Sequence, residues 1–219
     1  MLLQKSVFPL ATLSLVLQST FVVAQQSPVE VIVVSGSHQS ADIMALNSNV
    51  SLIDEQEIER VNAALASDIL NRASGVYVQA NNGVENLPSL RSPILTGPGA
   101  GGAFLFMQDN VATRAAGFAN NNGLAELNLA QADGIEVIQG PNSAVYGSNA
   151  VHGVINVLSL TPTNGGEAGI TFGPNDRVQF TGALGHIDDH GPATQGIGLN
   201  LQVIDDGGYQ DDSGFTSSK

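Results

Sequence analysis

The sequence predicts an α+β domain of short strands and short helices, followed by a run of antiparallel strands. Between residues 49 and 160, short apolar segments alternate with helix-capping and turn signals. Beyond Gly166, segments such as "RVQFTGALG" and "GIGLNLQVID" alternate apolar with small or polar residues. Period-two segments of roughly 9–11 residues are typical of an outer-membrane barrel wall. A soluble β-meander shows the same alternation, so both readings stay open at this point.

Composition excludes several classes of protein. The 219 residues contain no cysteine, which rules out disulfides and thiolate metal sites. Seven Lys and Arg face 20 Asp and Glu, a formal net charge of −13. Nucleic-acid binding depends on neutralising phosphates with basic side chains, so this charge disfavours it.

The first 24 residues resemble a cleaved export signal. Lys5 is followed by the apolar stretch "VFPLATLSLVLQSTFVV", and "VVA" at 22–24 supplies small residues for cleavage. A membrane anchor is the alternative, but polar residues and a proline interrupt the run, which is short for a span of roughly 20 residues. The pattern therefore favours export.

The segment "VEVIVV" at 29–34 lies close to the expected new N-terminus, and a polar, small-residue tether follows it. A short strand-forming segment on a tether suits addition to another protein's sheet edge. It equally suits a first strand of the domain's own sheet, and composition does not separate the two.

The next elements follow from local signals. "NVSLID" (49–54) predicts a strand, and Asp54 with Glu57 has capping-box spacing for a helix over "EQEIERVNAA". "ALASDILNRASG" predicts a second helix ending at Gly75. "VYVQA" (76–80) predicts a strand, "NNG" a turn, and "LPSLRS" an extended path.

The glycine segment "LTGPGAGGAFLFMQDN" (95–110) contains the spacing G-x-G-x-x-G at Gly97, Gly99 and Gly102. A dinucleotide loop must open a helix, whose N-terminus holds the phosphate. Here an apolar strand ending in a turn at Asp109-Asn110 follows instead. The glycines therefore predict a surface loop.

The stretch at 133–160 carries the most information. A strand over Ile135–Ile138 is broken by Gly140-Pro141, "NSAVYGS" predicts one turn of helix, and "HGVINVLSL" predicts another strand. "IEVIQGPNSAVYGSNAVHGVINVLS" closely resembles the signature of TonB-dependent outer-membrane receptor plug domains, IEVLRGPxSxLYGxxAxGGVINIITK. "SLIDEQEIERVNAALASDILNRASGVYVQ", "LRSPILTGPGAGGAFLFMQDNVAT" and "DDGGYQDDSGF" resemble other family segments in the right order.

The resemblance implies an α+β plug domain, a small mixed sheet with short helices, followed by the first antiparallel strands of an incomplete 22-stranded transmembrane β-barrel. The implied divisions are a signal peptide at 1–24, a TonB box and flexible linker at 25–40, a plug at 41–162, and the start of the barrel at 163–219. The implied signature residues are Gly140, Pro141, Tyr146, Gly147, Gly153 and Asn156.

The chain departs from the family pattern at a few positions. Gln139 stands where "RGP" has arginine, Ser92 where glycine follows the arginine, Ser74 where "PGV" has proline, and Asn110 where the "DG" turn has glycine. We expect these changes to loosen contacts inside the plug.

The resemblance also assigns a mechanism and partners. "VEVIVV" occupies the place of the TonB box, which implies that TonB, the energy-transducing inner-membrane partner, pairs with Glu30, Val31, Ile32, Val33 and Val34. A scarce solute, such as an iron–siderophore or another metal complex, would bind on the outer side. TonB would then pull on the box, and the solute would enter the periplasm. The implied location is the Gram-negative outer membrane.

A complete barrel wall of 22 strands needs on the order of 220 residues before loops, so we expect a longer parent protein. The alternative is a barrel-less, soluble periplasmic plug-like module with a binding or regulatory role. An enzyme is disfavoured, because His38, His152, His186 and His190 are scattered without a supporting motif. We expect no cofactor.

Candidate solute contacts lie in plug loops rich in Asn, Gly and Pro, which also suit plain turns. They are Asn81, Asn82, Pro98, Gly99, Gly101, Gly102, Asn120, Asn121 and Asn122. Arg91 is a candidate anion contact, or else a partner in an internal ion pair.

Metal sites are weakly indicated. "HIDDHG" (186–191) lies in a β-turn, so its histidine spacing favours a solvated turn over a metal site. Asp205, Asp206, Asp211 and Asp212 are weak calcium candidates, since calcium prefers oxygen ligands, and a solvated acidic loop is the simpler reading.

Overall fold

The structure is a computed structural model that describes residues 32–33, 41–42, 49–63, 65–80, 85–95, 101–116, 118, 122–129, 131–190, 195–208 and 214–219. Most of these residues belong to a plug region with a central sheet and to a second, antiparallel sheet. Nearer the N-terminus, β1 (Ile32–Val33) pairs antiparallel with β2 (Ala41–Asp42).

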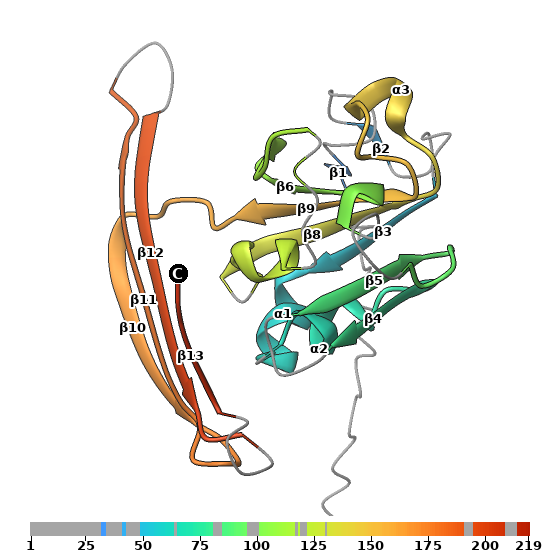
Figure 1. Cartoon of the computed structure of the whole chain (residues 1–219). Coiled ribbons are helices and arrows are strands. Elements are labelled where there is room, and N and C mark those ends of the chain that lie inside the picture. The colour runs from blue at the N-terminus through green and yellow to red at the C-terminus, as the bar shows by residue number, and fades with distance from the viewer. Residues whose placement is uncertain are drawn as a thin grey trace, which may run out of the picture. The chain divides into compact units, whose positions relative to one another are not determined.

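A five-stranded mixed sheet forms the centre of the plug region (Figure 1). Only β6 and β9 run parallel, and the other neighbours are antiparallel. Nearly every residue of β8 is buried, so this strand packs on both faces. That double burial agrees with the apolar residues on both of its faces, such as Ile135 in the larger part of the core and Ile138 in the smaller. In spatial order the strands are β3 (Asn49–Asp54), β8 (Ala132–Gln139), β9 (Gly153–Ser159), β6 (Phe104–Gln108) and β7 (Val111–Ala112).

Two short helices follow β3. α1 (Glu55–Val61) begins where the Asp54 carboxylate accepts a hydrogen bond of 2.9 Å from the backbone N–H of Glu57, which confirms the predicted cap. α1 ends earlier than predicted because Asn62 adopts the left-handed conformation, with φ of 42°. α2 (Ala66–Leu70) is also shorter than the predicted helix, and turns lead from it to Gly75, whose φ is 75°.

The remaining plug elements are short. β4 (Val76–Ala80) and β5 (Asn86–Leu90) form a separate hairpin in which Pro88 lies opposite Val78. The 3-10 turns are η2 (Gly101–Ala103) and η3 (Gly123–Glu126), and α3 (Ser143–Tyr146) is a single turn. η2 leads directly into strand β6, which confirms the strand predicted after the glycines.

The plug core has two parts, one on each face of the sheet. The larger part joins apolar side chains of the sheet, such as Phe104 and Ile135, with Ile58, Ile69 and Leu90 of α1, α2 and the β4–β5 hairpin. The smaller part packs near α3 and contains Leu105, Met107, Ile138, Ala150 and Val154, with Tyr146 against it.

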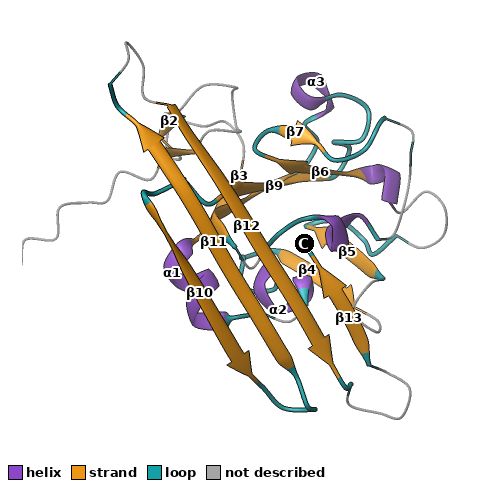
Figure 2. Cartoon of the chain, turned by 90° about the vertical axis from the view of Figure 1, so that its left-hand side faces the viewer, coloured by secondary structure: helices purple, strands orange, loops and turns teal. Residues whose placement is uncertain are grey.

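The second sheet contains four antiparallel strands in sequence order (Figure 2). They are β10 (Gly165–Phe172), β11 (Val178–Asp188), β12 (Gln195–Asp206) and β13 (Phe215–Ser218). The turn between β10 and β11 is tight, with Asn175 and Asp176 both at positive φ.

The two faces of this second sheet differ in polarity. One face carries exposed apolar side chains in neighbouring register, including Ile170, Phe172, Leu184, Ile197 and Leu199, which are 63–76% exposed. On the other face, Gln179 and Gln202 are almost fully buried. The predicted period-two alternation is therefore present, and it sorts apolar from polar residues.

Glycine at position 153 is required by close packing of β9 against β8 and β5. A Cβ there would lie 2.6 Å from the backbone oxygen of Ile138 and closer still to Leu90. Gly134, in β8, has nothing nearer than 3.5 Å.

We therefore expect Gly153→Ala to lower the free energy of unfolding by roughly 1–3 kcal/mol, because the backbone has to shift. The control Gly134→Ala should stay within about 0.5 kcal/mol of the parent. Urea denaturation of both variants measures the difference, and equal midpoints would contradict the close packing.

Candidate functional site

A buried polar network fixes the turn between β6 and β7. Asp109 and Asn110 both have positive φ, at 50° and 65°. The side-chain oxygen of Asn156 accepts a hydrogen bond of 3.0 Å from the Asn110 N–H. The Asn156 amide donates to Glu136 at 3.0 Å and to the Asn110 side-chain oxygen at 3.2 Å. Asn156 and Glu136 are fully buried, so the signature asparagine anchors this turn to the centre of the sheet.

The other acceptor of the turn is Asp109. Its carboxylate accepts hydrogen bonds from the backbone N–H and the hydroxyl of Ser159, at 2.8 and 2.7 Å. The Asp109 N–H donates to the Val157 carbonyl at 2.8 Å. Both the side chain and the backbone N–H of Asp109 therefore bind the turn to the last residues of β9.

Four of the signature residues build the connection from β8 to β9. Gly140 has φ of 94°, and its N–H donates to the His152 carbonyl at 2.9 Å. Pro141 follows, Tyr146 packs against the smaller core, and Gly147 ends α3 with φ of 92°. Positive φ favours glycine, which accounts for Gly140 and Gly147.

The departure at Gln139 places an amide side chain in a set of hydrogen bonds inside the plug. Its side-chain oxygen accepts from the Asn49 amide at 2.8 Å, and its amide nitrogen donates to the Ser74 carbonyl at 2.6 Å and to the Ser51 hydroxyl at 3.3 Å. These bonds join β8 to β3 and to the turn before β4. The amide thus ties three segments together without a charge.

Ser92 and Asn110, two other departures, also gain contacts. The Ser92 hydroxyl accepts from the Leu90 N–H at 3.3 Å, and the Ser92 carbonyl accepts from the Ser89 hydroxyl. The Asn110 side chain joins the network described above. The side chains of Gln139, Ser92 and Asn110 therefore all form hydrogen bonds within the plug.

The proposed TonB-contact segment is only partly described. Ile32 and Val33 form β1, opposite Asp42 and Ala41 of β2. Glu30, Val31 and Val34 lie outside the described residues. The backbone at Ile32 and Val33 is thus extended, as strand addition requires.

Few of the candidate solute contacts can be placed. Asn81, Asn82, Pro98, Gly99, Asn120 and Asn121 lie outside the described residues. Gly101 and Gly102 lie in η2, and Asn122 precedes η3. Arg91 has φ of 56°, its N–H donates to the Gly75 carbonyl at 3.0 Å, and the residue is exposed.

The alternative role of Arg91 in an internal ion pair finds no support, because no carboxylate lies within ion-pair distance of it among the described residues. Leu124 and Ala125 of η3 line a cavity of about 180 Å³, and among the described residues that line it are neither Arg91 nor those of η2.

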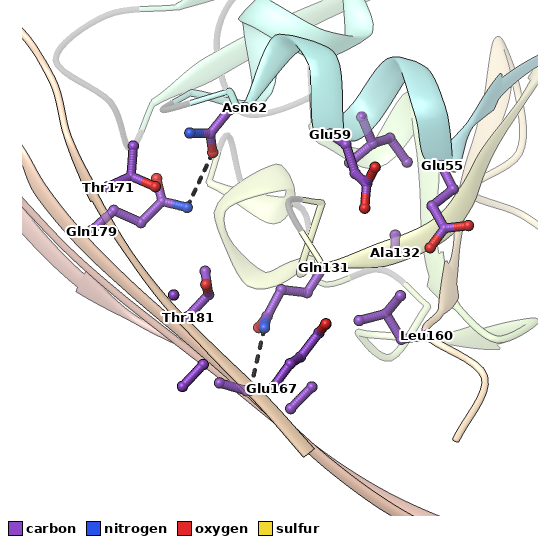
Figure 3. Close-up of a pocket in the computed structure, with 15 residues that line it drawn as sticks. Glu55, Glu59, Asn62, Gln131, Ala132, Leu160, Glu167, Thr171, Gln179 and Thr181 are labelled. Atoms are coloured by element: carbon purple, nitrogen blue, oxygen red, sulfur yellow. Dashed lines mark hydrogen bonds between the residues drawn. The ribbon is translucent and has the colours of Figure 1, made fainter. Parts of the chain in front are cut away.

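Cavities open between the plug and the inner face of the second sheet (Figure 3). One has a volume of about 380 Å³ and is lined by Glu55, Glu59 and Asn62 of the plug and by Glu167 and Gln179 of the strands. A neighbouring cavity of about 550 Å³ shares Glu55 and Glu167 and adds Asp133. Their charged lining residues are all acidic.

This arrangement affects the ionisation of Glu55. Desolvation by its surroundings raises the pKa of the Glu55 carboxyl above its ordinary value, and the nearby charges of Asp133, Glu59 and Glu167 raise it further. Among the described residues, no group of three or more acidic or histidine side chains has a geometry that could hold a metal ion.

Within the part of the chain that the structure describes, hydrogen bonds and no ion pairs cross between the plug and the strands. The Gln131 amide donates to the Gly182 carbonyl at 3.3 Å, and the Gln179 amide donates to the Asn62 side-chain oxygen at 3.3 Å, as Figure 3 shows. Arg177 donates to the Asn62 carbonyl at 3.4 Å. Sequence reasoning missed these residues, and the alternation of polar residues along "RVQFTG" is the only signal that pointed to Gln179.

The remaining metal candidates are partnered or outside the described residues. Asp205 accepts from the Thr216 hydroxyl at 2.7 Å, and Asp206 accepts from the Gly208 N–H at 2.8 Å. Asp211 and Asp212 lie outside the described residues. The first three residues of "HIDDHG" belong to strand β11 and not to the predicted turn. Both the N–H and the ring Nδ1 of His190 lie 3.0 Å from Asp188, and both side chains are largely exposed.

A search of the described residues for a membrane-crossing helix finds none of sufficient length and apolar character.

Comparison with known protein families identifies residues 42–154 as a TonB-dependent receptor plug domain. The match spans just over half of the chain, and the chain therefore belongs to this family.

Solved receptor structures share the fold. The ferric yersiniabactin uptake receptor FyuA from Yersinia pestis has a TM-score of 0.53 at 15% identity, over 73% of this chain and 24% of FyuA. FpvA from Pseudomonas aeruginosa, bound to a heterologous pyoverdine, has 0.61 at 14% identity, over 80% of this chain and 27% of FpvA. The alcaligin outer membrane receptor FauA from Bordetella pertussis has 0.58 at 14% identity, over 80% and 35%.

This chain thus spans 24–35% of the length of these three structures. The shared fold confirms the predicted fold class, a mixed-sheet plug followed by antiparallel strands.

We expect Asn156→Ala to destabilise the plug by roughly 1–3 kcal/mol. The buried Glu136 carboxylate would lose the hydrogen bond from Asn156, and the Asn110 N–H would lose its bond to the Asn156 side-chain oxygen. Asn110→Gly keeps the turn geometry and removes only an exposed acceptor, so it should cost less than about 1 kcal/mol. Urea denaturation at neutral pH measures both. A larger loss from Asn110→Gly than from Asn156→Ala would show that the network is not centred on Asn156.

Proposed function

We propose that this protein acts in TonB-dependent uptake of a scarce solute, such as an iron–siderophore complex, across the outer membrane. In this proposal the chain supplies the TonB-contact segment and the plug. Membership of the plug-domain family supports it, as does the similarity in fold to receptors whose names include ferric yersiniabactin and alcaligin.

The observation that carries the proposal is the polarity of the second sheet. Its exposed apolar face, with Phe172, Ile197 and Leu199, would meet lipid, while its polar face meets the plug. Lipid-exposed walls of outer-membrane proteins have this apolar-out, polar-in alternation. A soluble plug-like module would leave this apolar face in water, which disfavours that alternative.

The chain divides accordingly in this proposal. Residues 1–24 direct export, 25–40 contain the TonB-contact segment and its tether, 41–162 form the plug, and 163–219 begin the membrane-embedded wall. The plug and the wall meet through amide hydrogen bonds, with cavities lined by acidic side chains between them. Such an interface can be broken and remade without separating buried charge pairs.

TonB is the proposed partner of residues 30–34. Strand addition gives affinity through backbone hydrogen bonds, so it needs backbone donors in the added segment. A pull on a segment at the start of the plug would act on the β3 edge of the central sheet. The chemistry is binding and mechanical transport, with no catalytic group.

We expect Val33→Pro to abolish uptake while leaving solute binding at the cell surface intact, because proline removes a backbone donor. Val33→Ala keeps that donor and serves as the matched control. Binding of the purified protein to the periplasmic domain of TonB, together with growth on a panel of iron–siderophores, measures the effect. Normal TonB binding and growth with the proline variant would overturn the assignment of this segment.

A further inference from the structure

A third cavity lies between the plug and strands β12 and β13. Its lining differs from that of the two acidic cavities. Its volume is about 180 Å³. Ala63, Leu65 and Leu124 of the plug and Ile204 and Phe215 of the strands give it apolar walls. Its polar lining includes Asn86, Gln202 and Lys219, and no described acidic side chain lines it.

Gln202 is the unusual member of this lining. Its side chain points to the inner face of β12 and is only 3% exposed. Its amide nitrogen has no hydrogen-bond partner among the described residues. Leaving a buried donor unpaired costs free energy. A glutamine amide nitrogen carries two N–H donors, which are available to an acceptor placed in the cavity.

Lys219 adds a second donor. Its ammonium group lines the same cavity and donates to the Leu127 carbonyl at 2.6 Å. An ammonium group has three donors, so the bond to Leu127 leaves others available. Two donors, one of them positively charged, within apolar walls match a small apolar group that carries a carboxylate.

The position of the cavity connects it with the solute. Asn86 begins β5, shortly after Asn81 and Asn82 in sequence, and Leu124 belongs to η3, directly after Asn120–Asn122. The plug elements that line the cavity therefore adjoin two of the candidate solute loops in sequence.

We propose that this cavity is a subsite that binds a carboxylate on a small apolar group, with Gln202 and Lys219 as the donors. As a subsite of the transported solute it rests on the proposed uptake function, whereas binding of the carboxylate itself does not. Its size suits a group comparable to a benzene ring, since a cavity of about 150 Å³ accommodates benzene.

The test uses benzoate as the probe and benzylamine, of similar size but opposite charge, as the comparison. Both are titrated into the purified protein in detergent micelles, with the side-chain amide resonances of Gln202 followed by NMR. We expect benzoate to shift these resonances in a saturable way and to bind at least about tenfold more tightly than benzylamine, a difference of about 1.4 kcal/mol.

Three variants complete the test. Gln202→Leu removes the donor, and Gln202→Glu keeps the size but repels a carboxylate, so both should abolish benzoate binding. Gln195→Leu changes an exposed glutamine of the same strand and should leave binding unchanged. If Gln202→Leu fails to fold, Gln202→Glu decides the question.

Unchanged benzoate binding in the folded Gln202 variant, equal binding of benzylamine, or no saturable shift in the parent protein would each overturn the subsite. TonB binding by the same preparation reports on the uptake function separately, so failure of one proposal is distinguishable from failure of the other.

Discussion

The alternation of side chains along β10, β11 and β12 is the constraint on which the rest of the structure depends. A strand places successive side chains on opposite faces. The register of these strands therefore decides which side chains form the exposed outer face and which side chains face the plug. Leu184 lies opposite Leu199 on the outer face, and Thr181 lies opposite Gln202 on the inner face. A slip of one residue would exchange the two faces. It would place leucines against the polar plug and amides on the exposed side.

The plug contacts the polar inner face of the second sheet through neutral polar side chains. Gln131, Asn62 and Gln179 form the hydrogen bonds that cross to the strands, and carboxylates line the cavities between these contacts. In the plug interior, by contrast, the hydrogen-bonded pair of Asn156 and Glu136 is completely buried. The same asparagine also holds the turn between β6 and β7 through Asn110. Buried hydrogen bonds thus fix the plug interior, whereas the surface between the plug and the strands is held by hydrogen bonds that can be broken and formed again.

Local elements could be predicted from the sequence because their causes are local. The Asp54 cap, the strand after the glycines and the tight turn at Asp109-Asn110 all depend on neighbouring residues. The predicted ends of α1 and α2 lie too far along the chain. One left-handed residue, Asn62, ends α1, and asparagine marks such a helix end less strongly than glycine does. The family motif gave no physical reason for its signature residues, whereas the structure shows positive φ at Gly140 and Gly147 and buried hydrogen bonds at Asn156.

The contacts of the site could not be predicted because they depend on register and on distant segments. Glu136 and Asn156 meet because β8 and β9 pair in a particular register. Gln139 reaches Ser74, 65 residues away in the sequence. The cavity around Gln202 requires β5, η3 and β12 to converge. The hydrogen bonds of Gln139 and Asn110 could not be predicted either, because their partners are distant in sequence.

Fractionation of cells that produce the native protein tests whether the second sheet lies in the outer membrane. An antibody to residues 41–160 would be used to probe outer-membrane and soluble periplasmic fractions, with samples loaded with and without boiling. The account predicts a band in the outer membrane whose mobility changes on heating, as expected if the apolar face of β10–β12 lies in lipid within a stable barrel. A soluble periplasmic band with unchanged mobility would contradict the membrane assignment and the proposed transport function.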